Sequence, residues 1–476
     1  MENTKTEIIY YGILVYLVSL IVILVPTGYD PGEFWWHLKA GEWTVHHGFM
    51  TSDPFSHTTS GSWLNYNWLT EVLFYYAFTH VGVNGIYLIA FFGVGGIICA
   101  LVFATCLQRS RCLASTILIT LLVSQCVYMI ALKPHIISYL FTAWFMYVVN
   151  RYLQNRSTRL LWTLPALQAV WANVHVMFVF GWLASLILLA KAVENKRGIK
   201  RACLALALML AAPLINPYGY KIYPELVSLF QYGFETLPKI VKLIHIPEFM
   251  PPGSSWGGYT IYVVVALLAL IINRKNVSVV DACVFVLMFF LSMSQAKYVP
   301  YFAIVTAGIV AGNMPEAFTS RFSSHRALSM KTACVVLACV AVVLAYRLTA
   351  FLKHSPDMAT SPVQEVAALK AAGSPPRTGN MLNILDDGQY LLYELHPEYR
   401  TFIDARLHLF SKEVVGDYLK VVRGHQDGIR IIEKYNIDTV VLPKDFALIA
   451  ALKDKGWQVV HDGKRRTVLQ IHQIQH

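Results

Sequence analysis

The first 350 residues consist of long apolar runs separated by short polar turns. Many of these runs match or approach the ~20 residues that a helix needs to cross a lipid bilayer. We count about eleven of them, at 8–26, 85–107, 113–132, 136–150, 160–172, 176–193, 202–215, 260–272, 277–293, 300–312 and 332–348. The pattern therefore predicts a mainly α-helical membrane protein, with a bundle of about eleven transmembrane helices.

Two long loops interrupt this series, at 27–68 and 216–259. The segment that follows the first loop, 68–83, is apolar and aromatic but carries Glu71 and His80. Charged and titratable side chains are rare within spans, so we expect this segment to lie in the membrane interface as a helix. The transmembrane domain is thus predicted over 1–350, with both loops on its external side.

After residue 350 the pattern becomes that of a soluble domain. Helical repeats are predicted at 361–372, 412–422, 428–435 and 445–455, and short strands at 400–404, 438–442, 457–461 and 467–471. Alternating helices and strands are typical of an α/β fold. We therefore expect a second, small α/β domain over 351–476.

The distribution of charge predicts how the bundle is oriented. Only 14% of the residues are charged, against about 25% in soluble proteins, and the net charge is +11. The first 350 residues contain 23 Lys and Arg, of which 16 fall before the first run or in every second connection. Because cytoplasmic loops are enriched in Lys and Arg, we expect a cytoplasmic N-terminus and an extracytoplasmic C-terminal domain. The same pattern excludes nucleic-acid binding.

Candidate chemistry is concentrated in the loop 27–68. Asp30 and Glu33 stand three residues apart, directly after the first run. A partly desolvated carboxylate near the membrane surface can accept a proton from an acceptor hydroxyl. Candidates for binding an acceptor or a sugar in this loop are Trp36, His37 and Asp53. The alternative is an interfacial belt of tryptophans, with the acids as solvated loop residues or helix caps.

Cationic and polar side chains recur in the other predicted external turns. Candidates for holding a lipid-linked phosphate through charge-assisted hydrogen bonds are Lys133, His135, Lys221 and Lys297. Asn173 and His175 stand in one of these turns and are further candidates for sugar or acceptor binding. The alternative is that the lysines extend toward water and the histidines satisfy exposed carbonyl groups.

Several common catalytic motifs are absent from the sequence. It contains no HExxH, no paired CxxC, no Walker loop and no GxSxG, so zinc proteolysis, nucleotide hydrolysis and serine hydrolysis lack local support. We expect no required metal cofactor, with a divalent ion kept as the alternative. In the C-terminal part, Asp386 to Gly388 predicts a turn, and Asp404 with Arg406 an ion pair at a strand end.

The motifs together resemble those of a known family. They begin with Asp30 to Leu38 and Gly41, and continue with Asp53 to Ser56, Asn67 to Glu71, Lys133 to His135, Trp171 to His175, Asn216 to Gly219 and Phe402 to Arg406. The chain resembles bacterial multi-pass proteins related to GT-C glycosyltransferases. It is more distantly similar to the protein O-mannosyltransferases and the lipid A aminoarabinose transferases.

This resemblance implies a function. In such enzymes a polyprenyl phosphate carries the sugar donor, and an acid of the first external loop takes the proton of the acceptor hydroxyl. The resemblance implies that Asp30 and Glu33 are the acidic pair of this chain, and that Asp30 is the base that takes the proton of the acceptor hydroxyl. The acceptor would be a protein or a surface glycan at the outer face of the bacterial cytoplasmic membrane. This chain departs from the family pattern at Glu33, at Asn65 to Asn67 and at Lys133.

Two other functions fit the sequence without catalysis. A carrier or flippase for lipid-linked saccharides would use the same aromatic and basic residues but not the acidic pair. A membrane assembly factor would use the C-terminal domain to bind a partner protein. A carrier needs a polar path through the membrane midplane, whereas the predicted spans hold almost no charge apart from Asp281. A glycosyltransferase is therefore the favoured prediction.

Overall fold

The computed structural model divides the chain into two compact units. It describes residues 12–14, 16, 18, 32–59, 61–110, 112–127, 132–155, 158–244, 246, 249–253, 257–315, 335, 338–340, 342–346, 349, 358, 360–424 and 427–471. The first unit, here called the helical unit, comprises Met1–Thr27 and Val83–His354. The second, here called the α/β unit, comprises Gly28–Gly82 and Ser355–His476.

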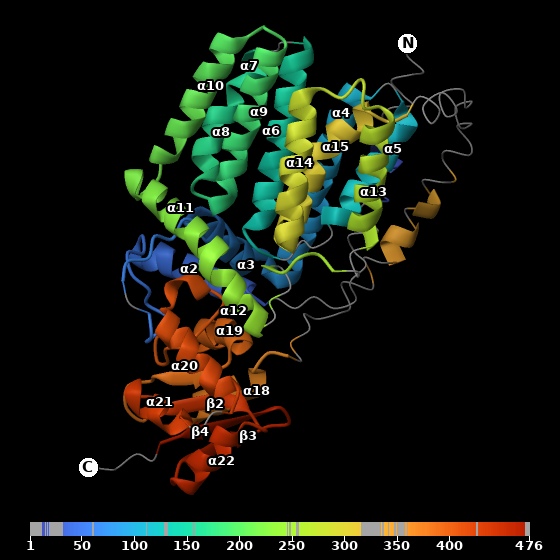
Figure 1. The fold of residues 1–476 in the computed structure, drawn as a ribbon. Helices are drawn as coiled ribbons and strands as arrows, with labels where there is room; N and C mark the ends of the chain where they lie inside the picture. Colours follow the sequence, from blue (N-terminus) through green and yellow to red (C-terminus); the bar gives the residue numbers. More distant parts are fainter. Residues whose placement is uncertain are drawn as a thin grey trace. The chain divides into compact units, whose positions relative to one another are not determined.

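The helical unit consists of apolar helices joined by short turns (Figure 1). Its elements are η1 (Ile89–Gly95), α4 (Gly96–Arg109), α5 (Leu113–Val127), α6 (His135–Asn155), α7 (Thr158–Leu161), α8 (Thr163–Trp171), η2 (Val176–Phe178), α9 (Val179–Glu194), α10 (Ile199–Ala211), η3 (Ala212–Leu214), η4 (Gly219–Lys221), α11 (Ile222–Gln231), η5 (Tyr232–Thr236), α12 (Leu237–Ile244), α13 (Gly257–Ile272), α14 (Val279–Ser294), η7 (Ala296–Tyr298) and α15 (Val299–Gly312).

Length and hydropathy identify some of these helices as membrane spans. Within the described ranges, Trp68–Arg109 and Val176–Glu194 are long and apolar enough to cross a bilayer. Ile199–Leu214 and Gly219–Val241 would make a third span if this bent pair counts as one. Shorter apolar helices are Leu113–Val127, Gly257–Ile272, Val279–Ser294 and Ala296–Gly312. The expectation of a mainly helical membrane protein is confirmed, while the count of eleven stays a prediction.

Helix α15 is the centre of the helical unit, since every residue from Val299 to Ala311 is buried. Its glycines allow this close packing. A Cβ at Gly308 would lie 3.1 Å from side-chain atoms of Thr105 and Arg109 on α4, and one at Gly312 would lie 3.2 Å from the Arg109 carbonyl oxygen. Small residues four apart let two membrane helices approach closely. The pair therefore fixes how α4 packs on α15.

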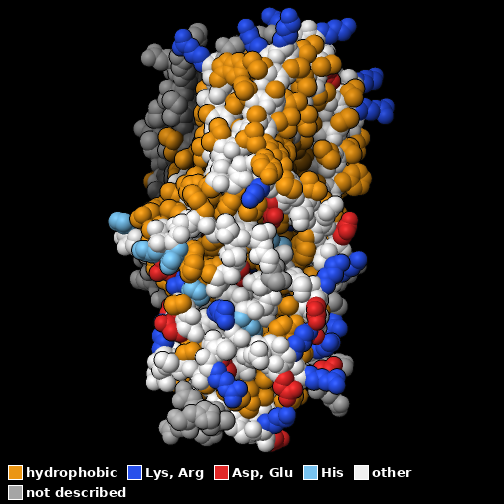
Figure 2. Space-filling view, turned by 90° about the vertical axis from the view of Figure 1, so that its left-hand side faces the viewer, with side chains coloured by type: hydrophobic (Ala, Val, Ile, Leu, Met, Phe, Trp, Pro, Cys, Tyr) orange, Lys and Arg blue, Asp and Glu red, His pale blue; other side chains and the backbone are white. Residues whose placement is uncertain are grey.

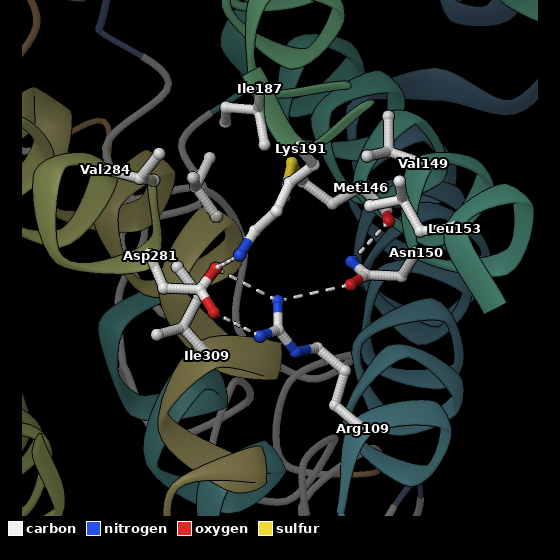
Figure 3. A pocket seen from close by; sticks show the side chains of 11 residues that line it. Arg109, Met146, Val149, Asn150, Leu153, Ile187, Lys191, Asp281, Val284 and Ile309 are labelled. Atoms are coloured by element: carbon white, nitrogen blue, oxygen red, sulfur yellow. Dashed lines mark hydrogen bonds and ion pairs between the residues drawn. The ribbon is translucent and has the colours of Figure 1, made fainter. Parts of the chain in front are cut away.

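A small pocket of the helical unit is lined by ion-paired side chains (Figure 3). Arg109 donates to both carboxylate oxygens of Asp281, with Nη2 2.5 Å from Oδ2 and Nη1 3.4 Å from Oδ1. Lys191 Nζ lies 3.2 Å from Asp281 Oδ1 and 3.0 Å from Glu194 Oε2. The side chains come from α4, α9 and α14, and each charge has an opposite charge beside it. The cluster thus connects three helices, and removing any one of its charges would leave a buried charge without its partner.

The α/β unit contains a four-stranded sheet in the order β1-β2-β4-β3, with β1 and β2 parallel and the other pairs antiparallel. Its elements are α2 (Phe34–His47), the first part of α3 (Trp68–Leu88), α18 (Val363–Ala372), β1 (Met381–Asn383), α19 (Leu385–Leu395), η8 (Leu407–Leu409), α20 (Lys412–Val422), α21 (Gly428–Lys434), β2 (Thr439–Pro443), α22 (Ala447–Asp454), β3 (Gln458–Asp462) and β4 (Arg466–Gln470). A small mixed sheet is thus present in the C-terminal part, where short strands and helices were expected.

Two local expectations were wrong. The residues predicted as a turn, Asp386 to Gly388, lie in the first part of α19, because acidic residues are favourable near a helix N-terminus. The strand expected at 400–404 is reduced to isolated bridges: Arg400 pairs with Asn380 and Thr401 with Ser56. Each bridge involves a single residue of this segment, so neither side forms the continuous backbone pairing that defines a β-strand.

The long first loop belongs to the α/β unit. The amide of His57 donates to the Thr401 carbonyl at 3.2 Å, and the Thr401 amide donates to the Phe55 carbonyl at 3.2 Å. The expected domain boundary had placed this loop with residues 1–350, whereas the structure groups Gly28–Gly82 with the C-terminal residues. The chain passes between the units at Gly82, whose φ of 66° interrupts α3 and favours glycine.

The surfaces of the two units differ in character. Figure 2 shows apolar side chains covering most of the visible face of the helical unit, and a mixture of charged and polar side chains on the α/β unit. Exposed basic residues lie where α10 and α14 begin, at Lys196, Arg197, Lys200, Arg201, Arg274 and Lys275. An apolar belt with cations at one end is the surface expected of a protein that spans a membrane.

Candidate functional site

Of the predicted acidic pair, Asp30 lies outside the described residues. Glu33 stands directly before α2, and its carbonyl accepts a hydrogen bond of 3.4 Å from the His37 amide. The side chains of Trp36 and His37 on α2 are buried. Helix α2 therefore holds two of the predicted residues, Trp36 and His37, in its first turn, directly after Glu33.

A further acid, Glu71 on α3, meets this turn and was not among the predicted site residues. His37 Nδ1 lies 2.8 Å from Glu71 Oε1, and Asn65 Nδ2 donates to Glu71 Oε2 at 2.5 Å. The helices approach so closely that a Cβ at Gly41 would lie 2.1 Å from the Glu71 carbonyl oxygen. The signal was present in the sequence, because Glu71 ends the motif that begins at Asn67.

Asp53 enters a buried charge cluster with the C-terminal part of the chain. Arg406 Nη1 donates to Asp53 Oδ1 at 2.6 Å, and Arg406 Nη2 donates to Asp404 Oδ2 at 2.6 Å. Ser56 donates to Asp404 Oδ2 at 3.0 Å, and all three charged side chains are at most 2% exposed. The motifs Asp53 to Ser56 and Phe402 to Arg406 are therefore two halves of one structure.

Aromatic rings surround the guanidinium of this cluster. The Arg406 Cζ atom lies 5.7, 5.2 and 5.0 Å from the ring centroids of Trp36, Phe55 and Trp63, within the range of a cation–π interaction. Although burial opposes ionisation, Arg406 holds the pKa of Asp404 below its usual range. Through their contacts with Arg406, Asp53 and Trp36 support the packing of α2 and the loop after it. Their role in sugar binding stays a prediction.

In the helical unit, two predicted histidines come together. The rings of His135, where α6 begins, and His175, before η2, have centroids 4.2 Å apart. Ser138 Oγ lies 2.9 Å from His175 Nδ1 and accepts a hydrogen bond of 2.7 Å from Trp171 Nε1. Ser138 thus bridges Trp171 and His175, and its hydroxyl can donate to His175 Nδ1 while it accepts from Trp171.

The charge state of His175 follows from its surroundings. Burial, with further contributions from His135 and Lys297, holds its pKa well below the usual range. Lys297 is near enough to His175 to act on its charge, and its Nζ lies 4.4 Å from the Phe249 ring centroid and 5.1 Å from that of Tyr298. A neutral donor beside a cation is an arrangement suited to an anionic oxygen.

The remaining predicted residues of the helical unit lie at the same end of the bundle. Asn173 donates to the carbonyls of Ala169 and Ile215, at 2.8 and 2.7 Å, which joins the end of α8 to the turn after η3. Lys133 stands two residues before α6, and Lys221 is exposed in η4. The structure thus brings His135 and His175 together, with Lys297 near enough to act on His175.

The two sets of predicted residues belong to different units: the acids to the α/β unit and the cations to the helical unit. Among the described side chains, no group of three or more His, Cys, Asp and Glu could hold a metal ion. The expectation that no metal is required stays a prediction.

Replacing Ser138 by alanine should destabilise the helical unit by about 1–3 kcal/mol, because Trp171 Nε1 and His175 Nδ1 would lose a buried partner. Thermal unfolding of the purified protein in detergent would measure the change. Ser294→Ala is the control, since Ser294 also lies on a helix but is exposed. Equal unfolding temperatures for the two variants would contradict the proposed hydrogen-bond chain.

Lowering the pH from 6.5 to 4 should destabilise the α/β unit. Burial lowers the pKa of His57, His396 and His408 from 6.5 to about 4. In this window the unfolded chain binds more protons at these sites than the folded chain. The free energy of unfolding therefore decreases as the pH is lowered. Asp387 opposes this trend below pH 6, because burial raises its pKa to about 6.

Unfolding temperatures measured across this window would test the effect. The variant His408→Leu should show a weaker dependence on pH, because one of the three protonation sites is gone. A dependence as steep as that of the wild type would rule out His408 as a contributor.

No protein-family model and no curated protein matches the chain by sequence. Similarity appears in solved structures. The crystal structure of the Archaeoglobus fulgidus oligosaccharyltransferase tethered with an acceptor peptide containing the NVT sequon gives a TM-score of 0.51 at 11% identity, covering 91% of this chain and 69% of that chain. The archaeal oligosaccharyltransferase AglB from the same organism, in complex with an inhibitory peptide and a dolichol-phosphate, gives 0.52 at 12% identity with the same coverage. At these identities the similarity shows the fold.

Proposed function

We propose that this chain is a membrane glycosyltransferase of the GT-C type, which moves a sugar from a polyprenyl-phosphate donor to a hydroxyl acceptor. The observation that carries the proposal is the likeness of fold, over 91% of the chain, to an oligosaccharyltransferase solved with a dolichol-phosphate. The sequence motifs add an acidic pair and a set of cations of the kinds that this chemistry needs.

The proposed reaction assigns each group a role. The acceptor hydroxyl gives its proton to the Asp30 carboxylate while its oxygen forms a bond to the anomeric carbon of the sugar. The bond between that carbon and the phosphate oxygen breaks, and the polyprenyl phosphate leaves with the electron pair. Glu33 orients the acceptor, and Lys297 with His135 stabilises the charge on the leaving phosphate.

The other predicted residues assist. Lys133 and Lys221 contribute positive charge around the phosphate, and His175 donates a neutral hydrogen bond from Nε2. His37 and Asn173 shape the binding surfaces for acceptor and sugar. We place the reaction at the outer face of the bacterial cytoplasmic membrane, with the N-terminus in the cytoplasm and the acceptor, a protein or a surface glycan, bound with the help of the α/β unit.

The contact pattern favours a transferase over a carrier. Among the described residues of the helical unit, the buried Lys and Asp side chains are Lys191 and Asp281, paired with each other at one end of α9 and α14. The 19-residue segment Val176–Glu194 that leads from His175 to this cluster is about 28 Å long. A carrier would need polar groups along that length. An assembly factor would not need the acidic pair.

A complementation experiment tests the proposal. Glycans and glycoproteins are compared by mass spectrometry between cells that lack the gene and cells complemented with wild type, Asp30→Asn or the control Asp445→Asn, which alters an exposed carboxylate. We expect one defined glycosylation to be lost in the deletion and in Asp30→Asn, at equal protein levels, and retained in the control. Full rescue by Asp30→Asn would refute Asp30 as the base.

A further inference from the structure

Two turns of the helical unit carry a cluster of exposed cations. The first turn lies between α9 and α10, and the second between α13 and α14. Together with the first residues of α10 they contribute Lys196, Arg197, Lys200, Arg201, Arg274 and Lys275, here called the basic patch. The Val280 amide at the start of α14 donates to Glu194 Oε1 at the end of α9, at 3.4 Å, so the two turns lie side by side. The basic patch is therefore one surface, and Figure 2 shows Lys and Arg side chains gathered at one end of the helical unit.

The acids beside the basic patch are already paired with other cations. Glu194 Oε2 lies 3.0 Å from Lys191 Nζ, and Asp281 Oδ1 lies 3.2 Å from the same nitrogen. Asp281 also pairs with Arg109. Among the ion pairs of the described residues, none includes a cation of the basic patch. A surface with this excess of positive charge attracts anions.

Both turns are fixed by the backbone. The Arg197 amide donates to the Ala192 carbonyl at 2.8 Å, and the Asn276 amide donates to the Asn273 carbonyl at 2.8 Å. Gly198 has a φ of +77°, a conformation that favours glycine. The backbone that carries the cations is thus ordered before any ligand binds, which lowers the entropy that binding must overcome.

Exposed apolar residues stand directly beside the basic patch. Val193, Ile272 and Val279 are 53%, 63% and 74% exposed. The segment Val176–Glu194, which is long and apolar enough to cross a bilayer, ends two residues before Lys196. In a membrane protein, acyl chains cover such apolar side chains, and cations within a few residues of the end of a span lie at the level of the lipid headgroups.

We propose that the basic patch binds the phosphate groups of anionic phospholipid, with phosphatidylglycerol as its occupant. The apolar neighbours place the cations at the level of the headgroups, and the excess of positive charge favours a lipid with a net negative charge over a zwitterionic one. Both turns fall among the connections predicted to be cytoplasmic, and clusters of about four to eight Lys and Arg directly beyond a span on that side are typical of anionic-lipid binding. The inference is independent of any transferase activity.

Native mass spectrometry tests the proposal. The full-length protein, purified in detergent, is incubated with equal amounts of phosphatidylglycerol and phosphatidylcholine that have the same acyl chains, and the lipids retained per protein are counted. The patch variant combines Lys196→Gln, Arg197→Gln, Lys200→Gln and Arg201→Gln. The control variant combines Lys412→Gln, Arg423→Gln, Lys455→Gln and Lys464→Gln, which lie in the α/β unit. Both variants lose four exposed cations, so their net charges change equally.

Wild type and control variant are expected to retain several-fold more phosphatidylglycerol than phosphatidylcholine, and the patch variant to retain the two about equally. Added salt should weaken the preference of the wild type, because it screens exposed charges. Gel filtration checks that each variant folds. If the patch variant does not fold, the double variant Arg274→Gln, Lys275→Gln replaces it, with a smaller expected decrease.

Three outcomes would overturn the proposal. Equal retention of the two lipids by the wild type would show that no anionic-lipid site exists. An unchanged preference in a folded patch variant would show that the anionic lipid binds elsewhere. An equal loss of preference in the control variant would show that the preference follows net charge and not the basic patch.

Discussion

Replacing Arg406 by methionine is expected to unfold the α/β unit or to destabilise it by about 3–5 kcal/mol. The substitution keeps most of the side-chain volume but removes the cation between Asp53 and Asp404, which are both buried. Two uncompensated carboxylates would remain beneath the rings of Trp36 and Phe55, and breaking a buried ion pair by removing one partner carries a cost of this size.

The effect would be measured by thermal unfolding and by limited proteolysis of the full-length protein, with the cleavage sites mapped by mass spectrometry. New sites are expected in 48–66 as well as in 355–476, because Arg406 joins these two segments. Arg423→Met serves as the control, as Arg423 is exposed and outside the cluster. If both variants unfolded like the wild type, the cluster would not hold the unit together.

Replacing Gly388 by alanine should have the second-largest effect on stability. A Cβ at this position in α19 would lie 2.2 Å from the Ile403 carbonyl oxygen and 3.0 Å from the Asp404 Cβ. The helix and the segment that carries Asp404 must then move apart, which typically costs about 1–3 kcal/mol and occasionally more. That movement would also displace Asp404 from Arg406, so the loss of packing around α19 is coupled to the loss of the ion pair.

The matched control is Gly416→Ala on α20, in the same unit. A Cβ there meets no atom within 4 Å. Alanine at this helical position should stabilise the protein by up to about 1 kcal/mol, because glycine has the lower helix propensity. Differential scanning calorimetry of the two variants should give shifts of opposite sign. A shift in the same direction would show that the contact with Ile403 does not set the packing of α19.

Elements whose structure depends on neighbouring residues were predicted well. The helix expected at 412–422 coincides with α20, and the strands expected at 457–461 and 467–471 differ from β3 and β4 by one residue. A helical repeat or an alternation of apolar residues is a local property, so a short stretch of chain contains all the information that it needs.

Elements whose structure depends on residues distant in the sequence were predicted wrongly. Asp386 to Gly388 was expected to be a turn, but Asp387 accepts hydrogen bonds from Arg466, 79 residues away, within α19. The 400–404 segment alternates like a strand, yet its neighbours in space are Asn380 and Ser56. The order of strands in a sheet cannot be inferred from the alternation within one strand.

Local sequence motifs were enough to select the types of residue in the candidate site, whereas the contacts between those residues depend on the tertiary structure. Residue type and position relative to the apolar runs were enough to select His135, His175 and Lys297, and to predict a membrane protein with a small α/β domain. Only the tertiary structure shows that Ser138 lies between Trp171 and His175, that Glu71 contacts His37, and that Asp53 pairs with Arg406. Hydrogen bonds and ion pairs act over about 3 Å in space, whatever the separation in sequence, so such partners become visible only when the chain has folded.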